Sequence, residues 1–136
     1  MTVFWDTNLF IYLIERHPLL HDKVLALYHH QRERGERLLT STLTLGELLA
    51  QPLRLGRSDL ARSYAQLLTT GSAIELIPFD HRAAEHYAAI RAHTTLRQPD
   101  AIQLACAVTG GAKTFVTNDQ RLWGLRVPGL EDIRGL

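Results

Sequence analysis

Four acidic side chains stand at or near positions where the sequence predicts that a helix begins. Asp6 and Asp119 each follow a short apolar run, Asp100 follows a proline, and Glu47 lies in an apolar helical segment. If these helices start at one edge of a common sheet, the four carboxylates share a pocket. Carboxylates brought together repel one another and cannot all stay ionised without a compensating cation. Mg²⁺ and Mn²⁺ take oxygen ligands and bind phosphate oxygens, so the pattern predicts a divalent metal site.

Each acid also has a purely structural explanation. Asp6 and Asp119 could cap helices, and Asp100 in a first helical turn would gain roughly 0.3 to 1 kcal/mol from the helix dipole. Glu47 lies three residues after Thr44, which is the spacing of a capping box. Taken singly, these explanations are the stronger ones. Taken together, they put all four carboxylates on the same edge of one sheet, which favours the metal site.

Three polar residues accompany these acids. Asn8, Thr117 and Asn118 lie within two positions of Asp6 or Asp119. Their side chains could hold a carboxylate or a metal-bound water by hydrogen bonds. Turn formation explains Asn8 and Asn118 equally well. Thr117, at the end of a strand, is the best functional candidate of the three.

The elements that must position these residues alternate between strands and helices. Strands are predicted at residues 2–5, 38–40, 73–77 and 114–117, with a fifth at the edge over Leu125–Val127. The intervening segments have helical spacing, and Pro52 is expected to end one helix at Gln51. Parallel strands need helical crossovers, so the order predicts an α/β fold, a three-layer α/β/α domain with a parallel sheet of four or five strands. Ligands of such folds bind beyond the carboxyl ends of the strands, where Asp6 and Asp119 fall.

Composition narrows the class of protein further. The 136 residues, 46% of them apolar, suffice for one core, so we expect a single domain over residues 1–136. With no long apolar run and no secretory leader, the expected location is the cytoplasm, with no membrane partner. Cys106 is the only cysteine, and its alanine-rich surroundings indicate a buried side chain. The net charge of +1 identifies no partner, but arginine dominates the basic residues, which weakly favours phosphate binding.

Four short motifs occur in order along nearly the whole chain: Asp6-Thr7-Asn8, Ser41 with Glu47, Asp100-Ala101 and Thr117-Asn118-Asp119. Together they resemble the PIN-domain ribonucleases, and at this length the chain is most similar to the toxin of a VapBC-type toxin-antitoxin pair. The resemblance implies a Mg²⁺- or Mn²⁺-dependent endoribonuclease in which the four acids form the metal pocket and Thr117 supplies a supporting hydroxyl. It also implies an RNA substrate, a homodimer and a cognate antitoxin protein. Trp5 is bulkier than the family pattern suggests, which leaves the packing under the site in question.

The chemistry expected of such a site is metal-assisted hydrolysis. One or two ions would activate a water and neutralise charge on the phosphoryl oxygens and the leaving alcohol. Asp6 and Asp100 are assigned as principal ligands, while Asp119 and Glu47 would bind a second ion or orient the water. Two alternatives remain: a PIN-like scaffold that binds RNA or a partner without cutting, and a haloacid-dehalogenase-type phosphatase. The phosphatase needs a second aspartate two positions after Asp6, where this chain has Asn8.

Overall fold

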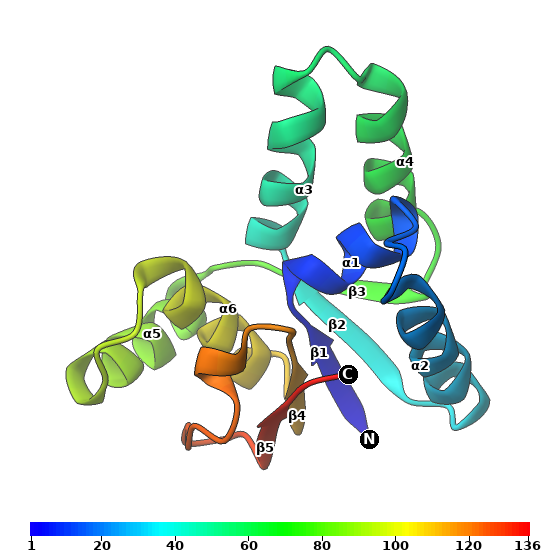
Figure 1. The fold of residues 1–136 in the computed structure, drawn as a ribbon. Coiled ribbons are helices and arrows are strands. Elements are labelled where there is room, and N and C mark those ends of the chain that lie inside the picture. Colours follow the sequence, from blue (N-terminus) through cyan, green and yellow to red (C-terminus); the bar gives the residue numbers. More distant parts are fainter.

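The computed structural model describes residues 1–136 and contains one sheet of five parallel strands in the order β3-β2-β1-β4-β5. The strands are β1 (Thr2–Trp5), β2 (Arg37–Ser41), β3 (Ile74–Ile77), β4 (Thr114–Val116) and β5 (Asp132–Arg134). Helices cover both faces, as Figure 1 shows. One layer contains α1 (Thr7–Ile14), α2 (His21–Glu33), α3 (Thr42–Arg54) and α4 (Ser58–Thr69), and the other α5 (His81–His93) and α6 (Gln98–Thr109). This confirms the predicted three-layer α/β/α class.

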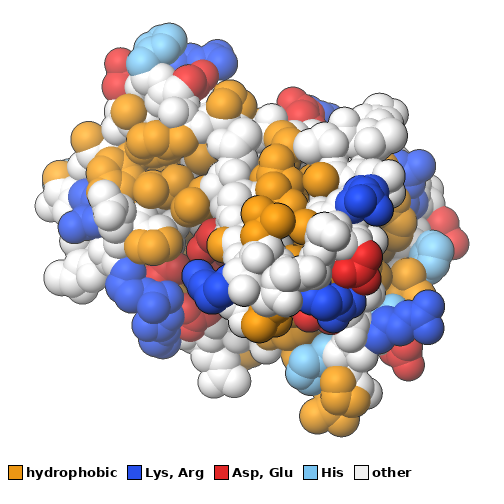
Figure 2. Space-filling model, turned by 90° about the horizontal axis from the view of Figure 1, so that it is seen from above, with side chains coloured by type: hydrophobic (Ala, Val, Ile, Leu, Met, Phe, Trp, Pro, Cys, Tyr) orange, Lys and Arg blue, Asp and Glu red, His pale blue; other side chains and the backbone are white.

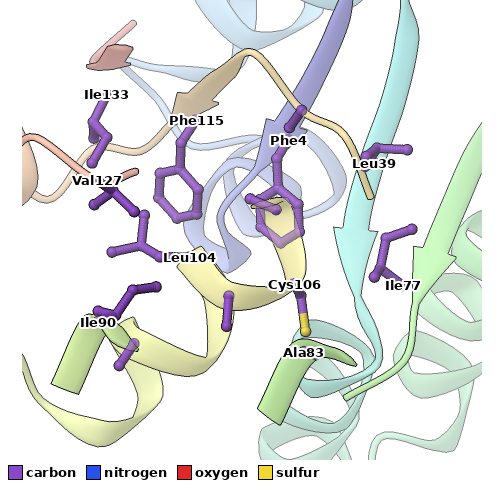
Figure 3. Close-up of a cluster of buried hydrophobic side chains, with 14 of the residues drawn as sticks. Phe4, Leu39, Ile77, Ala83, Ile90, Leu104, Cys106, Phe115, Val127 and Ile133 are labelled. Carbon is purple, nitrogen blue, oxygen red and sulfur yellow. The ribbon is translucent and has the colours of Figure 1, made fainter. Parts of the chain in front are cut away.

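The central strand β1 is apolar on both faces because each face meets a helical layer. In β1, Val3 and Trp5 pack towards the layer that contains α1 to α4, and Phe4 packs towards α5 and α6. Phe4 stacks on Phe115 of the neighbouring β4 with ring centroids 5.2 Å apart, at the centre of the cluster drawn in Figure 3. Trp5 is fully buried beside Phe10, with ring centroids 5.4 Å apart, and its indole N–H has no hydrogen-bond partner. The central strand is therefore anchored on both sides, and the residues that follow it are held in place.

The fifth strand is not where the sequence predicted it. Leu125–Val127 forms no strand, and β5 is instead Asp132–Arg134, paired with Thr114 to Val116. Val127 is buried in the core cluster, so its apolar character serves packing rather than sheet pairing. Only Ile133 of the actual strand is buried. A three-residue strand with charged residues on either side of one isoleucine has too little alternation to be recognised from sequence.

Helix α3 also differs from the prediction, because it continues through Pro52 to Arg54. A proline inside a helix lacks one hydrogen-bond donor and crowds the preceding turn, at a cost of about 3 kcal/mol. The Pro52 ring is buried, and α3 forms a hairpin with α4 (Figure 1), so tertiary packing offsets that cost. None of the six helices has the length and apolar character needed to cross a membrane.

Cys106 lies in the core on α6, as its surroundings predicted, and is fully buried. Burial raises the pKa of its thiol to about 11, and the nearby Asp80 carboxylate adds to the shift. Because the thiolate is the reactive form, its population at pH 8 is about a hundredfold lower than for an ordinary cysteine of pKa 9. We therefore expect Ellman's reagent to modify the folded protein at least a hundredfold more slowly than the protein unfolded in guanidinium. Equal rates in both states would contradict this burial.

Candidate active site

The predicted acids meet at the carboxyl edge of the sheet. Asp6, Glu47, Asp100 and Asp119 all line one cavity of about 320 Å³. Asp6 follows β1, Asp119 follows β4, Asp100 lies in the first turn of α6, and Glu47 lies in α3. Figure 2 views the molecule from this side and shows acidic side chains in a depression with basic side chains directly beside them. Residues separated by up to 113 positions thus share one pocket, as the sequence predicted.

Asp6 both caps a helix and lines the acidic cavity. It is the N-cap of α1, where its Oδ1 accepts a hydrogen bond from the Thr7 backbone N–H at 2.9 Å. Its Oδ2 accepts a second hydrogen bond, at 2.7 Å, from the hydroxyl of Thr117, so the predicted supporting role of Thr117 has a direct contact. Burial raises the pKa of Asp6 above its ordinary value, and the carboxylates of Asp100 and Glu47 raise it further. The charged form of the Asp6 carboxylate is therefore disfavoured in this pocket, because no basic side chain pairs with it.

Glu47 is not part of a capping box. The N-cap of α3 is Ser41, whose Oγ accepts a hydrogen bond from the Thr44 N–H at 3.1 Å, and Glu47 is already in the second turn. Its Oε1 instead accepts a hydrogen bond from the Thr7 hydroxyl at 2.7 Å. This bond joins α3 to the first residue of α1 and points Glu47 into the pocket.

Gln103 of α6, a residue for which no role was predicted, connects the side chains of this part of the pocket. Its amide nitrogen lies 2.8 Å from Thr44 Oγ1, 3.1 Å from Thr7 Oγ1 and 3.4 Å from Glu47 Oε1. Its carbonyl oxygen accepts a hydrogen bond from the hydroxyl of Ser41. The side chain is only 3% exposed. One signal was available: Gln103 is a polar residue three positions after Asp100, on the same face of an otherwise apolar helix.

Asn8 and Asn118 were predicted to hold a carboxylate or a metal-bound water, and their side chains bond to residues other than the four acids, so a contact with a metal-bound water stays a prediction. Asn8 Oδ1 accepts a hydrogen bond from the Asn118 backbone N–H at 3.4 Å, and Asn118 Nδ2 donates to the Tyr12 hydroxyl at 3.0 Å. Neither amide bonds to any of the four carboxylates. These long-range hydrogen bonds connect α1 to the loop after β4. Asn8 still lines the cavity.

Two of the four acids have basic partners. Arg97 Nε lies 3.0 Å from Asp100 Oδ2, and Arg121 Nε lies 2.9 Å from Asp119 Oδ1. The hydrogen bonds from Arg121 hold the pKa of Asp119 below its ordinary value, and Arg97 contributes to the same shift. Asp6 and Glu47 form no ion pair.

The donor set fits a hard divalent cation by its chemistry, because it consists of carboxylate oxygens and includes two acids without a cationic partner. As the side chains stand, however, no three His, Cys, Asp or Glu residues are grouped closely enough to hold an ion. Asp100 and Asp119 are instead hydrogen-bonded to arginines. We expect these side chains to rotate when an ion binds.

The chain has a parallel sheet between two helical layers, with an acid-lined pocket at the carboxyl edge of that sheet. These features are shared with a known protein family. Residues 3–126 match the family model of the PIN domain, and the chain belongs to that family. It is similar to Ribonuclease VapC23 of Mycobacterium tuberculosis, with 29% identity over 123 residues that cover 88% of this chain and 94% of that protein.

Solved structures agree on the fold. A VapBC2 structure from Rickettsia felis, bound to a promoter DNA fragment, matches with a TM-score of 0.79 and 20% identity, covering 99% of this chain and 98% of that chain. A DNA-bound VapBC structure from Salmonella typhimurium matches with a TM-score of 0.77 and 24% identity over the same shares. At these identities the likeness establishes the fold alone. With the PIN family established, the haloacid dehalogenase alternative no longer stands.

Proposed function

We propose that this chain is a metal-dependent endoribonuclease, built as a single nuclease domain over residues 1–136, that acts as the toxin of a toxin-antitoxin pair. The observation that carries the proposal is the convergence of Asp6, Glu47, Asp100 and Asp119 on one cavity. Membership of the PIN family and the similarity to a VapC ribonuclease over nearly the whole chain support the same activity.

The four carboxylates would hold Mg²⁺ or Mn²⁺, with Asp6 and Asp100 as principal ligands. When bound, such an ion supplies Lewis-acid stabilisation of charge that develops on the phosphoryl oxygens. The protein's own contribution is positioning. Thr117 fixes one oxygen of Asp6 by a 2.7 Å hydrogen bond, and Thr7 with Gln103 fixes Glu47. Asp6 and Glu47 thus have defined orientations, which lowers the cost of organising the site around substrate.

We infer that the chain binds a cognate antitoxin, since structures with the same fold include a toxin-antitoxin complex and a member of a toxin-antitoxin family. A homodimer is proposed on the resemblance to the VapBC-type toxins. RNA is the substrate that the ribonuclease relatives indicate. Arginines next to the pocket are suited to phosphate oxygens because a guanidinium presents several donors in one plane.

Removal of the metal tests the activity directly. Purified protein is incubated with total RNA in Mg²⁺, in Mn²⁺, or in excess chelator, and the products are resolved on a denaturing gel. We expect discrete fragments with either ion and intact RNA with chelator, with cleavage restored when the ion is returned. Intact RNA under all three conditions would favour the non-catalytic scaffold, and equal cleavage under all three would contradict metal dependence.

A further inference from the structure

Arg97 contacts two of the four pocket carboxylates from the edge of the cavity. Its Nε lies 3.0 Å from Asp100 Oδ2, and its Nη2 lies 3.8 Å from Asp119 Oδ2. Arg97 directly precedes α6, whereas Asp119 follows β4, so one guanidinium joins two separate elements. Arg97 also lines the same cavity as the acids. It is therefore part of the pocket and not a distant surface charge.

Arg97 places a positive charge beside Asp100, which has no other basic partner, and adds a second one beside Asp119, which also pairs with Arg121. The hydrogen bond from Arg97 occupies one lone pair of Asp100 Oδ2 and orients that carboxylate towards the guanidinium, and the positive charge of the guanidinium repels a divalent ion nearby. The Arg97 side chain is 61% exposed, and ion pairs at such exposed positions contribute little stability. Arg97 can therefore be displaced from Asp100 and Asp119 at small cost.

We propose that Arg97 is an internal counter-cation of the pocket, which a divalent ion displaces and which then binds a phosphate group of the RNA. The inference rests on the proposed ribonuclease function. Displacement leaves the guanidinium beside the pocket, because its backbone is fixed by a hydrogen bond of 3.0 Å from the Ala101 N–H to the Arg97 carbonyl. A planar guanidinium grips phosphate as well as carboxylate. Arg97 thus exchanges one anionic partner for another as the site fills.

Calorimetric titration with Mn²⁺, in the absence of RNA, tests whether Arg97 competes with a divalent ion for the carboxylates. Arg97→Met should bind Mn²⁺ about two- to tenfold more tightly than wild type, because the Arg97 hydrogen bond to Asp100 and the repulsion from Arg97 are removed, while Arg121 stays on Asp119 in both proteins. Arg97→Lys keeps the charge but cannot contact two carboxylates through separate nitrogens, so its affinity should be intermediate. The matched control is Arg57→Met: Arg57 also precedes a helix and pairs with an aspartate, Asp59, but lies outside the cavity. Its Mn²⁺ affinity should stay within twofold of wild type.

Steady-state cleavage at saturating Mn²⁺ tests whether Arg97 binds a phosphate group of the RNA. Arg97→Met should raise KM for RNA about three- to tenfold and leave kcat within twofold, since phosphate contacts contribute affinity rather than chemistry. A purely structural role would instead weaken Mn²⁺ binding and lower kcat.

The possible results separate this inference from the proposed function. Unchanged or weaker Mn²⁺ binding by Arg97→Met, in protein whose circular dichroism is native, overturns the counter-cation role. An affinity of Arg97→Lys equal to wild type overturns the bridging contact as the cause. Tighter binding with an unchanged KM overturns the phosphate contact. In each case wild-type cleavage of RNA would still support the ribonuclease, whereas a wild-type protein that neither binds Mn²⁺ nor cuts RNA would remove both proposals.

Discussion

Asp6→Asn is expected to lower the rate of RNA cleavage at least about a hundredfold, equivalent to roughly 2.7 kcal/mol of transition-state stabilisation. Asp6 contributes a carboxylate to the pocket from the end of the central strand, and Asp100 and Glu47 are close enough to raise its pKa. Asparagine has nearly the same shape and can still cap α1, but it removes the charge that would bind the ion. Initial rates of cleavage of a labelled RNA in Mg²⁺ and Mn²⁺ measure the effect.

The control for this variant is another aspartate that caps a helix. Asp80 accepts hydrogen bonds from the Arg82 and Ala83 N–H groups at the start of α5 and lies outside the pocket. Asp80→Asn should cleave RNA within about twofold of wild type. Mn²⁺ at a hundred times its Kd should stabilise wild type and Asp80→Asn by about 2.7 kcal/mol and should stabilise Asp6→Asn much less. Cleavage by Asp6→Asn equal to that of Asp80→Asn would show that Asp6 only caps the helix.

Gln103→Leu is expected to destabilise the fold by about 2 to 4 kcal/mol, although leucine is similar in size and common in helices. The substitution removes a 3% exposed amide, so the buried Ser41 hydroxyl loses the acceptor of its proton and Thr44 Oγ1 loses its 2.8 Å donor. It also releases Glu47, so cleavage by the folded fraction should fall about tenfold or more. Urea unfolding gives the stability, and cleavage rates well below the unfolding midpoint give the activity.

Gln66→Leu provides the comparison, because Gln66 is an exposed residue in the interior of α4. Its free energy of unfolding should change by less than about 0.5 kcal/mol. If Gln103→Leu is as stable and as active as Gln66→Leu, the hydrogen-bond network around Gln103 does not hold the site together.

The sheet was largely predictable because its strands carry strong local signals. β1, β2, β3 and β4 are dense in apolar residues, and helices with clear periodicity separate them, so the parallel order follows from the need for crossovers. The predictions failed where long-range packing outweighs local preference. Pro52 lies inside α3 because its ring is buried, and β5 pairs with β4 although only Ile133 gives it an apolar residue.

The sequence by itself determined which acids could share a pocket, because Asp6, Asp100 and Asp119 each stand at a boundary that local preferences mark and that parallel topology places on one edge. Only the tertiary structure decided what each acid contacts. Glu47 is held by Thr7 and Gln103 from two other helices, and Arg97 spans Asp100 and Asp119. Apart from the pair of Arg97 and Asp100, these contacts join residues that are 22 to 56 positions apart. A hydrogen bond between side chains also depends on distances of a few tenths of an ångström. No local pattern encodes that precision, so partners across elements become known only once the chain is folded.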